Sequence, residues 1–393
     1  MKKIFVINVI AVAITCALMA SDPIPQPQLT KDFPAPEPPC PLTLAAQPRT
    51  GTPKNIIFII GDGMGQNAVR YAGLYAHGRS ESLVMNQLPM HALAITNSVS
   101  GTTDSAASGT ALSSGYKTIN GMLGMNPNKE KFRSIAREAQ SIGKAVGIIT
   151  ADGLVGATPA AFYAHVESRD LTDAIAEHAL ASDYEILIGN NAAHFLPKDK
   201  GGVRKDDRDV TAEFAAKGYQ RVDTLDALKN TDGLPLLGLA SRSYLLDDIT
   251  RLAQYSTDAF ARLAADPDGF FIMIEPPFAD SGGHGNNPDY SIGGTLMTDF
   301  VVKAALDWAL EHGDTLIVVT ADHETGGLYF APNTANPRRP LVGYTTKAHT
   351  PNPVDVFAFG PGSERFSGII DNTDIPKTMA DLWGVSLNNP VEE

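Results

Sequence analysis

The chain has few cysteines and a deficit of basic residues for its length. Only two cysteines, Cys16 and Cys40, occur among 393 residues, so disulfide bonds cannot be its main source of stability. Lysine and arginine number 31 against 44 acidic residues, which gives a formal net charge of −13. A basic surface for nucleic-acid phosphates is therefore not expected. Hydrophobic residues make up 43% of the chain and charged residues 19%, a composition that excludes a wholly disordered protein.

The first twenty residues have the layout of a secretory signal peptide. Lys2 and Lys3 precede an apolar run from Ile4 to Met19. A stretch of small residues that ends near Ala20 follows, as at a cleavage site. A retained membrane anchor is the alternative, but the run is short for a span of about 20 residues and lacks a basic stop-transfer flank. We therefore expect residues 1–20 to be removed on export to the periplasm or the extracellular space, leaving no membrane span.

A proline-rich stretch follows the signal peptide. Proline occupies 10 of the 32 residues from Asp22 to Pro53, which predicts an extended, poorly packed segment. We interpret residues 21–53 as a flexible arm, with docking of a partner as an alternative use. Residues 54–393 show no internal repeat and no second linker of this kind, so we expect them to form a single catalytic domain.

From Asn55 onwards, short β-rich runs alternate with longer helical runs. This alternation predicts an α/β fold with a mostly parallel sheet covered by helices. The expected strands are 55–60, 145–150, 184–188, 270–274, 315–320 and 354–359, and the expected helices are 131–141, 171–181, 244–265 and 292–311. The charged stretch 197–209 is interpreted as a surface insertion.

Polar residues follow three of the expected strands at the point where each strand ends. Asp62 follows the first strand, Glu275 follows the strand over 270–274, and Asp322-His323 follows the strand over 315–320. Because ligands bind beyond the carboxyl ends of strands in open α/β sheets, we expect these groups to converge. One Asp after a strand is usually a helix cap, but three such strand ends indicate a site.

The segment from Glu275 to His284 combines possible metal ligands with glycine and proline. Its two prolines and two glycines predict an irregular loop. Carboxylates and imidazoles such as Asp280 and His284 suit Zn²⁺ or a similar ion. The alternative is a turn held by side-chain hydrogen bonds with a surface histidine, and the nearby Asp322-His323 pair favours the metal.

Asp104 and Ser105 begin a run of small residues that is typical of a tightly packed helix start. A hydroxyl in the first turn faces the helix dipole and free N–H groups, which favour an anion. An ordinary N-cap is the alternative interpretation. No G-x-S-x-G motif surrounds Ser105, which argues against an α/β-hydrolase triad. A nucleophilic Ser105 would then require a metal to hold its deprotonated oxygen.

Three further residues could contribute to an anion or metal site. The hydroxyl of Thr158 could cap a helix that begins at Pro159. Arg169 carries a planar guanidinium that can bind two oxygens of a phosphate or sulfate. His349 precedes a buried strand, and a single histidine in such a place is more often structural than a ligand.

Taken together, these segments resemble the alkaline phosphatases. The matching pieces occur in family order: Gly61–Gly65, Thr103–Ala111, Ala157–Ala161 with Arg169, Glu275 with Asp280 and His284, Thr320–Gly327, and His349–Thr350. The resemblance extends from residue 55 to about residue 385. It implies a three-layer α/β/α sandwich with a large central, mostly parallel sheet.

The resemblance also implies a metal-dependent phosphomonoesterase with two zinc ions, one magnesium ion and a phosphoseryl intermediate on Ser105. Arg169 would bind the substrate phosphate, oriented by Asp104. The implied metal ligands are carboxylates, imidazoles and hydroxyls: Asp280, His284 and His349 for the first zinc; Asp62, Asp322, His323 and Ser105 for the second; Asp62, Thr158 and Glu275 for magnesium.

Three positions depart from the common family pattern. Gly156 stands where many members carry Asp or His near the third metal, so a side chain that would tune this ion is missing. Ser281 follows Asp280 where relatives often have Trp, His or Lys helping to hold phosphate. The metals and Arg169 are therefore expected to carry more of the phosphate binding. Pro276 stands where Gly is usual, which stiffens the segment.

The expected substrates are small phosphate monoesters, with inorganic phosphate as product. The family resemblance also implies a possible homodimer. A phosphodiesterase of the same superfamily is the nearest alternative. A sulfatase is excluded because Ser105 lacks the following x-Pro-x-Arg segment. An alternative of another class is a non-catalytic exported phosphate-binding protein, which would use the same helix N-terminus and Arg169.

Overall fold

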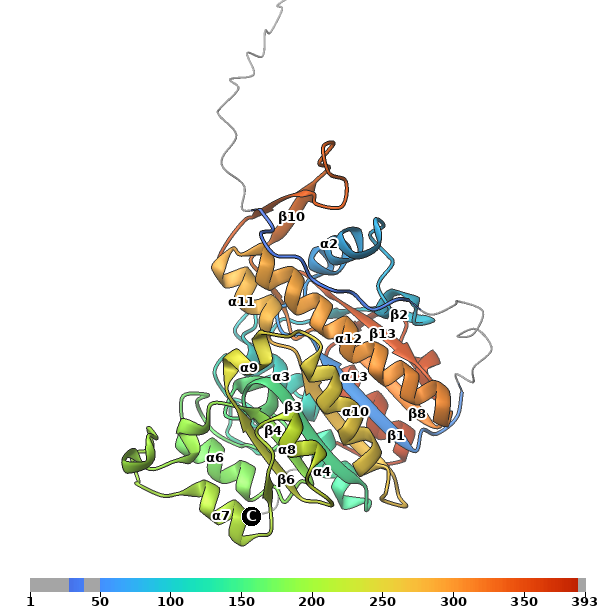
Figure 1. Cartoon of the computed structure of the whole chain (residues 1–393). Coiled ribbons are helices and arrows are strands. Elements are labelled where there is room, and N and C mark those ends of the chain that lie inside the picture. Colours follow the sequence, from blue (N-terminus) through green and yellow to red (C-terminus); the bar gives the residue numbers. More distant parts are fainter. Residues whose placement is uncertain (1–27, 39–49, 388–393) are drawn as a thin grey trace, which may run out of the picture.

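The fold is organised around a ten-stranded sheet, seen in a computed structural model that describes residues 28–38 and 50–387 (Figure 1). The strands of this sheet are β1 (Asn55–Ile60), β2 (Met90–Ile95), β3 (Ala145–Gly153), β4 (Ile186–Asn190), β5 (Gln220–Arg221), β6 (Leu236–Ala240), β7 (Phe270–Glu275), β8 (Thr315–Thr320), β13 (Val354–Phe359) and β14 (Gly368–Asp371). Their order is β14-β2-β13-β8-β1-β7-β3-β4-β6-β5. Only β13 runs antiparallel to its neighbours β2 and β8, so the predicted, mostly parallel sheet is confirmed.

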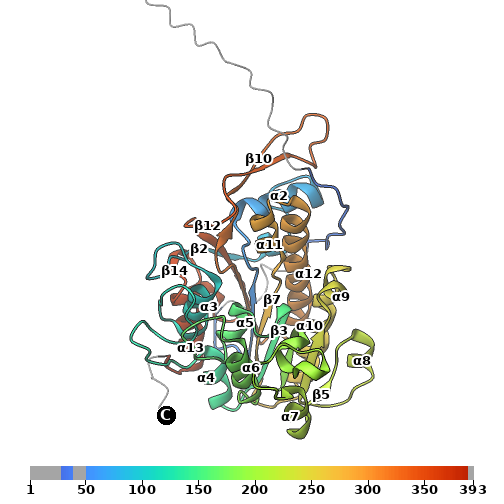
Figure 2. The ribbon, with the colours of Figure 1, turned by 90° about the vertical axis from the view of Figure 1, so that its left-hand side faces the viewer.

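Helices cover both faces of the sheet, which gives the expected three layers (Figure 2). One face carries α2 (Gln66–His77), α8 (Leu225–Lys229), α9 (Arg242–Leu246), α10 (Arg251–Leu263), α11 (Phe278–Gly285) and α12 (Pro288–His312). The other carries α3 (Ser105–Ser114), α4 (Ile135–Ser141), α5 (Ala157–Ala160) and α13 (Asp374–Trp383), and α6 (Thr172–Leu180) packs with α7 (Val210–Ala216). No helix within residues 28–38 and 50–387 has both the length and the apolarity needed to cross a bilayer.

Smaller elements extend beyond the carboxyl edge of the sheet or connect its parts. Two short antiparallel pairs are β9 (Glu324–Thr325) with β12 (His349–Thr350), and β10 (Leu328–Ala331) with β11 (Leu341–Tyr344). The short 3-10 helices are η1 (Met85–Gln87), η2 (Ala192–Phe195), η3 (Lys198–Lys200) and η4 (Ser363–Arg365). The pairing of β9 with β12 is the one that matters for the site.

The central strands are continuous apolar runs because both of their faces are covered. Every residue of β1, β7 and β8 is buried, as is typical of parallel strands between two helical layers. The predicted bounds of β1, β8 and β13 are confirmed residue by residue. The strand predicted over 184–188 lies two residues later, in β4.

Two of the predicted helices differ from the structure in ways that local chemistry explains. The helix expected over 244–265 is interrupted, because Asp248 accepts hydrogen bonds from the backbone N–H and hydroxyl of Thr250 and ends α9 before α10 begins. The helix expected over 131–141 begins only at Ile135. Ser134 is its N-cap, accepting a hydrogen bond from the Arg137 N–H.

The prediction of an irregular loop after Glu275 is wrong, because residues 278–285 form the helix α11. Its two prolines lie before the first helical residue, where a missing N–H costs little. Its glycines allow close packing: a side chain on Gly283 would place its Cβ 2.4 Å from the carbonyl oxygen of Thr325. The tertiary contacts of α11 thus outweigh the weak helix propensity of glycine.

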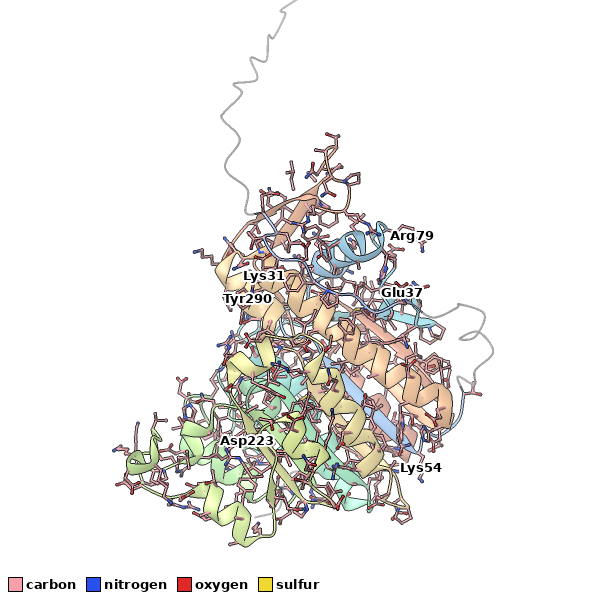
Figure 3. The ribbon with its side chains drawn as sticks, viewed as in Figure 1. Lys31, Glu37, Lys54, Arg79, Asp223 and Tyr290 are labelled. Carbon is pink, nitrogen blue, oxygen red and sulfur yellow. The ribbon has the colours of Figure 1, made fainter. Side chains whose placement is uncertain are left out.

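The described part of the arm, residues 28–38, has no helix or strand, but contrary to the prediction it is not poorly packed. Asp289 accepts hydrogen bonds from the backbone N–H groups of Thr30 and Lys31, and Leu29 is only 6% exposed. Figure 3 shows Lys31 beside Tyr290 at the start of α12. Residues 28–38 therefore dock on the domain because α12 offers a carboxylate and an apolar surface.

Several predictions fall on the part of the chain that the structure does not describe. The signal peptide over residues 1–20, most of the arm, and both cysteines lie outside the described residues. The division into a signal peptide, an arm and one catalytic domain over 54–393 stays a prediction.

Candidate metal centre and active site

The polar groups at three strand ends lie side by side because β8, β1 and β7 are neighbours in the sheet. Asp62 follows β1, Glu275 ends β7, and Asp322 lies two residues beyond β8. All three residues are buried, with exposed fractions between 0% and 8%. Parallel strands end at the same edge of the sheet, and the structure thereby brings these carboxyl groups together.

A glycine allows the loop after β1 to approach α11. Gly63 has a φ of 69°, and a Cβ at this position would lie 2.4 Å from Cα of Asp280. The Asp280 N–H donates to the Asp62 carbonyl over 2.9 Å, and the Asp62 N–H donates to the Pro276 carbonyl over 3.1 Å. Pro276 has no N–H to donate, but its carbonyl group accepts this hydrogen bond and so helps to hold the loop after β1.

The first cluster consists of Asp280, His284 and His349. The two Nε2 atoms lie 3.1 Å apart, and Oδ1 of Asp280 lies 3.3 Å and 3.5 Å from them. Nδ1 of His284 bonds the Lys347 carbonyl and Nδ1 of His349 bonds the Thr103 carbonyl. Because each Nδ1 must donate its proton to a carbonyl, neutral rings leave both Nε2 lone pairs facing each other. A cation or a shared proton is needed between them.

The second cluster surrounds Nε2 of the fully buried His323. Ser105 Oγ lies 3.2 Å from this nitrogen, Asp322 Oδ2 lies 3.1 Å away and Asp62 Oδ1 lies 3.8 Å away. Neither carboxylate oxygen has a hydrogen bond of normal geometry within the described residues. Unpaired buried oxygens are costly, which makes this group a suitable site for a cation.

The tautomer of His323 distinguishes this arrangement from a catalytic triad. Thr325 donates its hydroxyl proton to Asp280 over 2.6 Å, so it accepts from Nδ1 of His323, 3.1 Å away. A triad places a carboxylate at Nδ1, whereas here the carboxylates approach Nε2. The geometry therefore favours a metal between His323 and Ser105 over general-base catalysis by His323 alone.

The third cluster combines Glu275 with Thr158. Thr158 is the second residue of α5, whose N-cap is Gly156, so the prediction that it caps a helix starting at Pro159 is wrong. Its Oγ1 is buried and has no hydrogen-bond partner within the described residues. Glu275 accepts a hydrogen bond of 2.5 Å from Thr150, which leaves its other oxygen for a ligand.

The electrostatics of the clusters also call for a cation. Burial and then the charge of Asp322 raise the pKa of Asp62 well above its usual range. Burial and then the charge of Asp152 raise the pKa of Glu275 to about 8. Burial opposes the charge on Asp280 too, but its contacts with histidines outweigh it and lower its pKa to about 2. Carboxylate, imidazole and hydroxyl ligands of this kind fit zinc and magnesium.

The phosphate-binding candidates lie at the start of α3. Ser105 is the first residue of this helix, and Asp104 is its N-cap, accepting from the Ala107 N–H over 2.9 Å. The other carboxylate oxygen accepts from the Gly121 N–H over 3.0 Å and lies 3.4 Å from Nη1 of Arg169. Asp104 thus contacts both the start of α3 and the guanidinium of Arg169.

His349 lies among the possible metal ligands, close to Asp280 and His323, although a single histidine before a buried strand is more often structural. The β9–β12 pairing sets His349 opposite Thr325 and stacks its ring on His323 with centroids 3.5 Å apart. Two residues each of β9 and β12 are too few to predict from a pattern. Thr325 was also missed, although it lies two residues after His323.

A Ser at a helix start beside clusters of carboxylates and imidazoles at strand ends defines a hydrolase that uses bound metal ions. The family model described as alkaline phosphatase matches residues 53–337 and 330–385. The chain therefore belongs to the alkaline phosphatase family, and it is an enzyme with the metal-dependent phosphatase activity of that family.

Named relatives and solved structures agree with this assignment. Alkaline phosphatase H of Pseudomonas aeruginosa is 30% identical over 397 residues, which cover 82% of this chain and 83% of that protein. Alkaline phosphatase of Escherichia coli is 28% identical over 410 residues, covering 84% and 86%. The structure of alkaline phosphatase from the Antarctic bacterium TAB5 superposes with a TM-score of 0.77 at 30% identity, covering 84% of this chain and 98% of that one. A mutant of that enzyme has been solved with Mg bound in the M3 site.

Proposed function

We propose that this enzyme hydrolyses small phosphate monoesters to an alcohol and inorganic phosphate through a phosphoserine on Ser105. The observation that carries this proposal is the position of Ser105 Oγ, which lies at the start of α3 and 3.2 Å from His323 Nε2. That place combines the N-terminus of a helix with two carboxylate oxygens that have no hydrogen-bond partner among the described residues. A hydroxyl with these neighbours is suited to attack phosphorus once a cation is bound.

We propose two zinc ions and one magnesium ion at the three clusters. Asp280, His284 and His349 would hold the first zinc. The second zinc and the magnesium would share Asp62, and their other ligands are those assigned above from the family resemblance. The TAB5 structure with bound Mg supports a magnesium in the third position. When bound, the ions supply positive charge that stabilises the attacking and leaving oxygens of an in-line displacement.

The chain's own residues divide the reaction between them. Arg169, held by Asp104, binds two phosphoryl oxygens and orients phosphorus toward Ser105. Ser105 Oγ gives its proton to water and forms a bond to phosphorus while the ester P–O bond breaks, and the alkoxide takes a proton from water and leaves as the alcohol. A water molecule then attacks phosphorus, the P–Oγ bond breaks, inorganic phosphate is released, and one proton of the attacking water goes to Ser105 Oγ.

Two alternatives are separated from this proposal by different observations. A phosphodiesterase of the same superfamily would use the same ions, so only substrate preference tells it apart. A non-catalytic phosphate-binding protein would not need Ser105 among the carboxylates, and membership of an enzyme family argues against it.

The experiment compares p-nitrophenyl phosphate with bis-p-nitrophenyl phosphate and traps the intermediate by acid quench. We expect strong monoester preference and a phosphoserine at Ser105. Ser105→Ala should lower turnover by at least about 10³-fold, since a nucleophile is removed. The matched control is Ser113→Ala in the same helix, whose hydroxyl donates to the Thr110 carbonyl and to no other group in the described part of the chain. Unchanged turnover in Ser105→Ala refutes the assignment, and diester preference moves it to the phosphodiesterase.

We also propose that residues 1–20 direct export, because their basic start and apolar run have the form of a signal peptide. N-terminal sequencing of protein recovered from the periplasm or medium tests this, and an intact Met1 there contradicts cleavage. A homodimer stays a prediction, which sedimentation of the purified protein decides.

A further inference from the structure

A guanidinium without an acidic partner lies beside the first metal-ligand cluster. Arg242 begins α9, and its Nη2 donates a hydrogen bond to Ser281 Oγ over 3.3 Å. Its guanidinium also lies over the ring of Phe278, 5.8 Å from the centroid. No carboxylate within the described chain forms an ion pair with Arg242. Its only hydrogen bond is long and made to a neutral hydroxyl, so an anion can replace that hydroxyl at little cost.

The position of Ser281 directs this positive charge to the active site. Ser281 follows Asp280 and lies three residues before His284 on α11, and residues three apart on a helix are neighbours. The guanidinium therefore lies within one helical turn of two proposed ligands of the first zinc. Figure 1 shows α9 next to α11, near the upper ends of β3 and β4.

A cleft at the carboxyl edge of the sheet has both Arg242 and Asp152 in its lining. It has a volume of about 530 Å³ and its lining includes Asp152, Asn190, Ser241 and Arg242, from the carboxyl ends of β3, β4 and β6. Asp152 lies next to Gly156, the N-cap of α5, because a Cβ on Gly156 would lie 2.8 Å from Oδ2 of Asp152. The cleft thus joins Arg242, which bonds Ser281, to Asp152, whose charge acts on Glu275.

The charge balance of this edge requires positive groups wherever phosphate is to bind. Asp62, Glu275, Asp280 and Asp322 lie there together, and the whole chain carries a net charge of −13. A phosphate dianion approaching this edge is repelled unless cations face it locally. Arg169 supplies one such group from the side of α3. Arg242 is an unpaired guanidinium on the side of α11.

We propose that Arg242 is a second phosphate-binding arginine, which pairs with an oxygen of the phosphoryl group from the α11 side. It supplies the positive charge that Ser281 does not. Arg242 thereby shares the larger part of the phosphate binding that the sequence assigns to the metals and Arg169. This inference rests on the proposed function, because it assumes that phosphorus lies between Ser105 and the first cluster.

The test measures binding of inorganic phosphate to the zinc- and magnesium-loaded protein by calorimetry, which needs no turnover. Arg242→Gln should weaken phosphate binding about 10- to 100-fold, the usual loss for a hydrogen bond to a charged group. Arg242→Lys should retain part of the affinity. Arg221→Gln, which removes an exposed arginine paired with Asp223, is the control. Metal content by mass spectrometry should be equal in all four proteins.

Kinetics with two small esters separate phosphate binding from recognition of the alcohol. For ethyl phosphate and phosphoglycolate, which differ by a carboxylate, Arg242→Gln should lower kcat/KM by the same factor. A loss confined to phosphoglycolate overturns the inference, because Arg242 would then bind the organic part. Unchanged phosphate affinity in Arg242→Gln also overturns it. If phosphate affinity falls in Arg242→Gln but the wild type forms no phosphoserine, the proposed function fails while Arg242 remains a phosphate ligand.

Discussion

Arg204 and Asp322 are both charged and both fully buried, but only Arg204 has all of its charge balanced within the chain. Arg204 lies in the stretch 197–209, and its guanidinium donates to both carboxylate oxygens of Asp206, over 2.9 Å and 2.5 Å. It also donates to Glu177 over 3.1 Å and to the carbonyls of Asp173 and His194. The predicted surface insertion therefore has a buried ionic anchor.

The edge around Asp322 shows the opposite arrangement. Asp322 Oδ1 accepts from the Gly63 and His323 N–H groups. Its Oδ2, like Asp62 Oδ1 and Thr158 Oγ1, has no hydrogen-bond partner in the described part of the chain. Buried charges are retained when they are paired, so one region pairs them with side chains and the other keeps oxygens free for an added cation. The contrast separates groups that stabilise the fold from groups that bind a ligand.

The largest expected effect comes from removing the charge of Asp322. Asp322→Asn keeps the Oδ1 acceptor but should lose zinc and lower kcat by at least about 10³-fold, because a ligand is lost. The measurements are metal content by mass spectrometry and turnover of a monoester.

Asp299→Asn is the matched control for this substitution. Asp299 is also fully buried and accepts two backbone N–H groups, from Val84 and Met85, yet it lies in the middle of α12, outside the three clusters. Equal zinc content in Asp322→Asn and Asp299→Asn contradicts the distinction between the two kinds of buried carboxylate.

The next largest effect is on stability and concerns Arg204. Arg204→Met removes the buried guanidinium from Asp206, while Glu177 keeps its ion pair with Arg208. It should lower the free energy of unfolding by about 2–4 kcal/mol, less than for a fully buried pair because these partners are part-exposed. Arg208→Met, in the same network but with a half-exposed side chain, should cost less than about 1 kcal/mol. Denaturant unfolding measures both. Turnover per folded molecule and metal content should not change, and a loss of metal in Arg204→Met would remove the contrast.

A smaller effect, on the pH dependence of stability, is expected at His165, which lies outside the three metal-ligand clusters. Burial lowers the pKa of His165 to about 4, against the hydrogen bond of its Nε2 with the Phe132 carbonyl. The unfolded chain, with a histidine pKa near 6.5, binds the proton first, so stability falls as the pH drops from about 6.5 to about 4. His165→Gln should reduce this fall by at most about 3 kcal/mol. Denaturant unfolding in chelator at several pH values measures the free energy of unfolding of both proteins. If it falls equally with pH in the wild type and in His165→Gln, the lowered pKa of His165 is contradicted.

The parts of the fold that the sequence predicts are those with a strong local pattern. β1, β8 and β13 are six-residue strands made mostly of apolar residues, and their bounds agree with prediction. Ser105 and Asp104 were also placed correctly, because an N-cap followed by small residues is a local signal. The end of an expected strand and the residue types, rather than periodicity, identified Glu275, Asp280 and His284 as candidate ligands, and the family resemblance supplied their grouping.

The failures are places where tertiary contacts outweigh local preference. α11 forms despite its glycines because they allow close approach to neighbouring segments. The docking of residues 28–38 depends on Asp289, more than 250 residues away. Arg242 precedes Ser281 by 39 residues, so no spacing rule connects it with the site.

The central claim is that the carboxyl edge of β8, β1 and β7 is completed by metal ions, and thermal unfolding with and without chelator tests it most directly. Metal-loaded protein should melt several degrees higher than chelated protein, since a ligand that binds only the folded state stabilises it. Adding zinc and magnesium back should restore both the melting temperature and the monoester turnover of the wild type. The same addition should not restore turnover in Asp322→Asn. Identical melting curves and equal turnover in chelator and in metal would contradict the account.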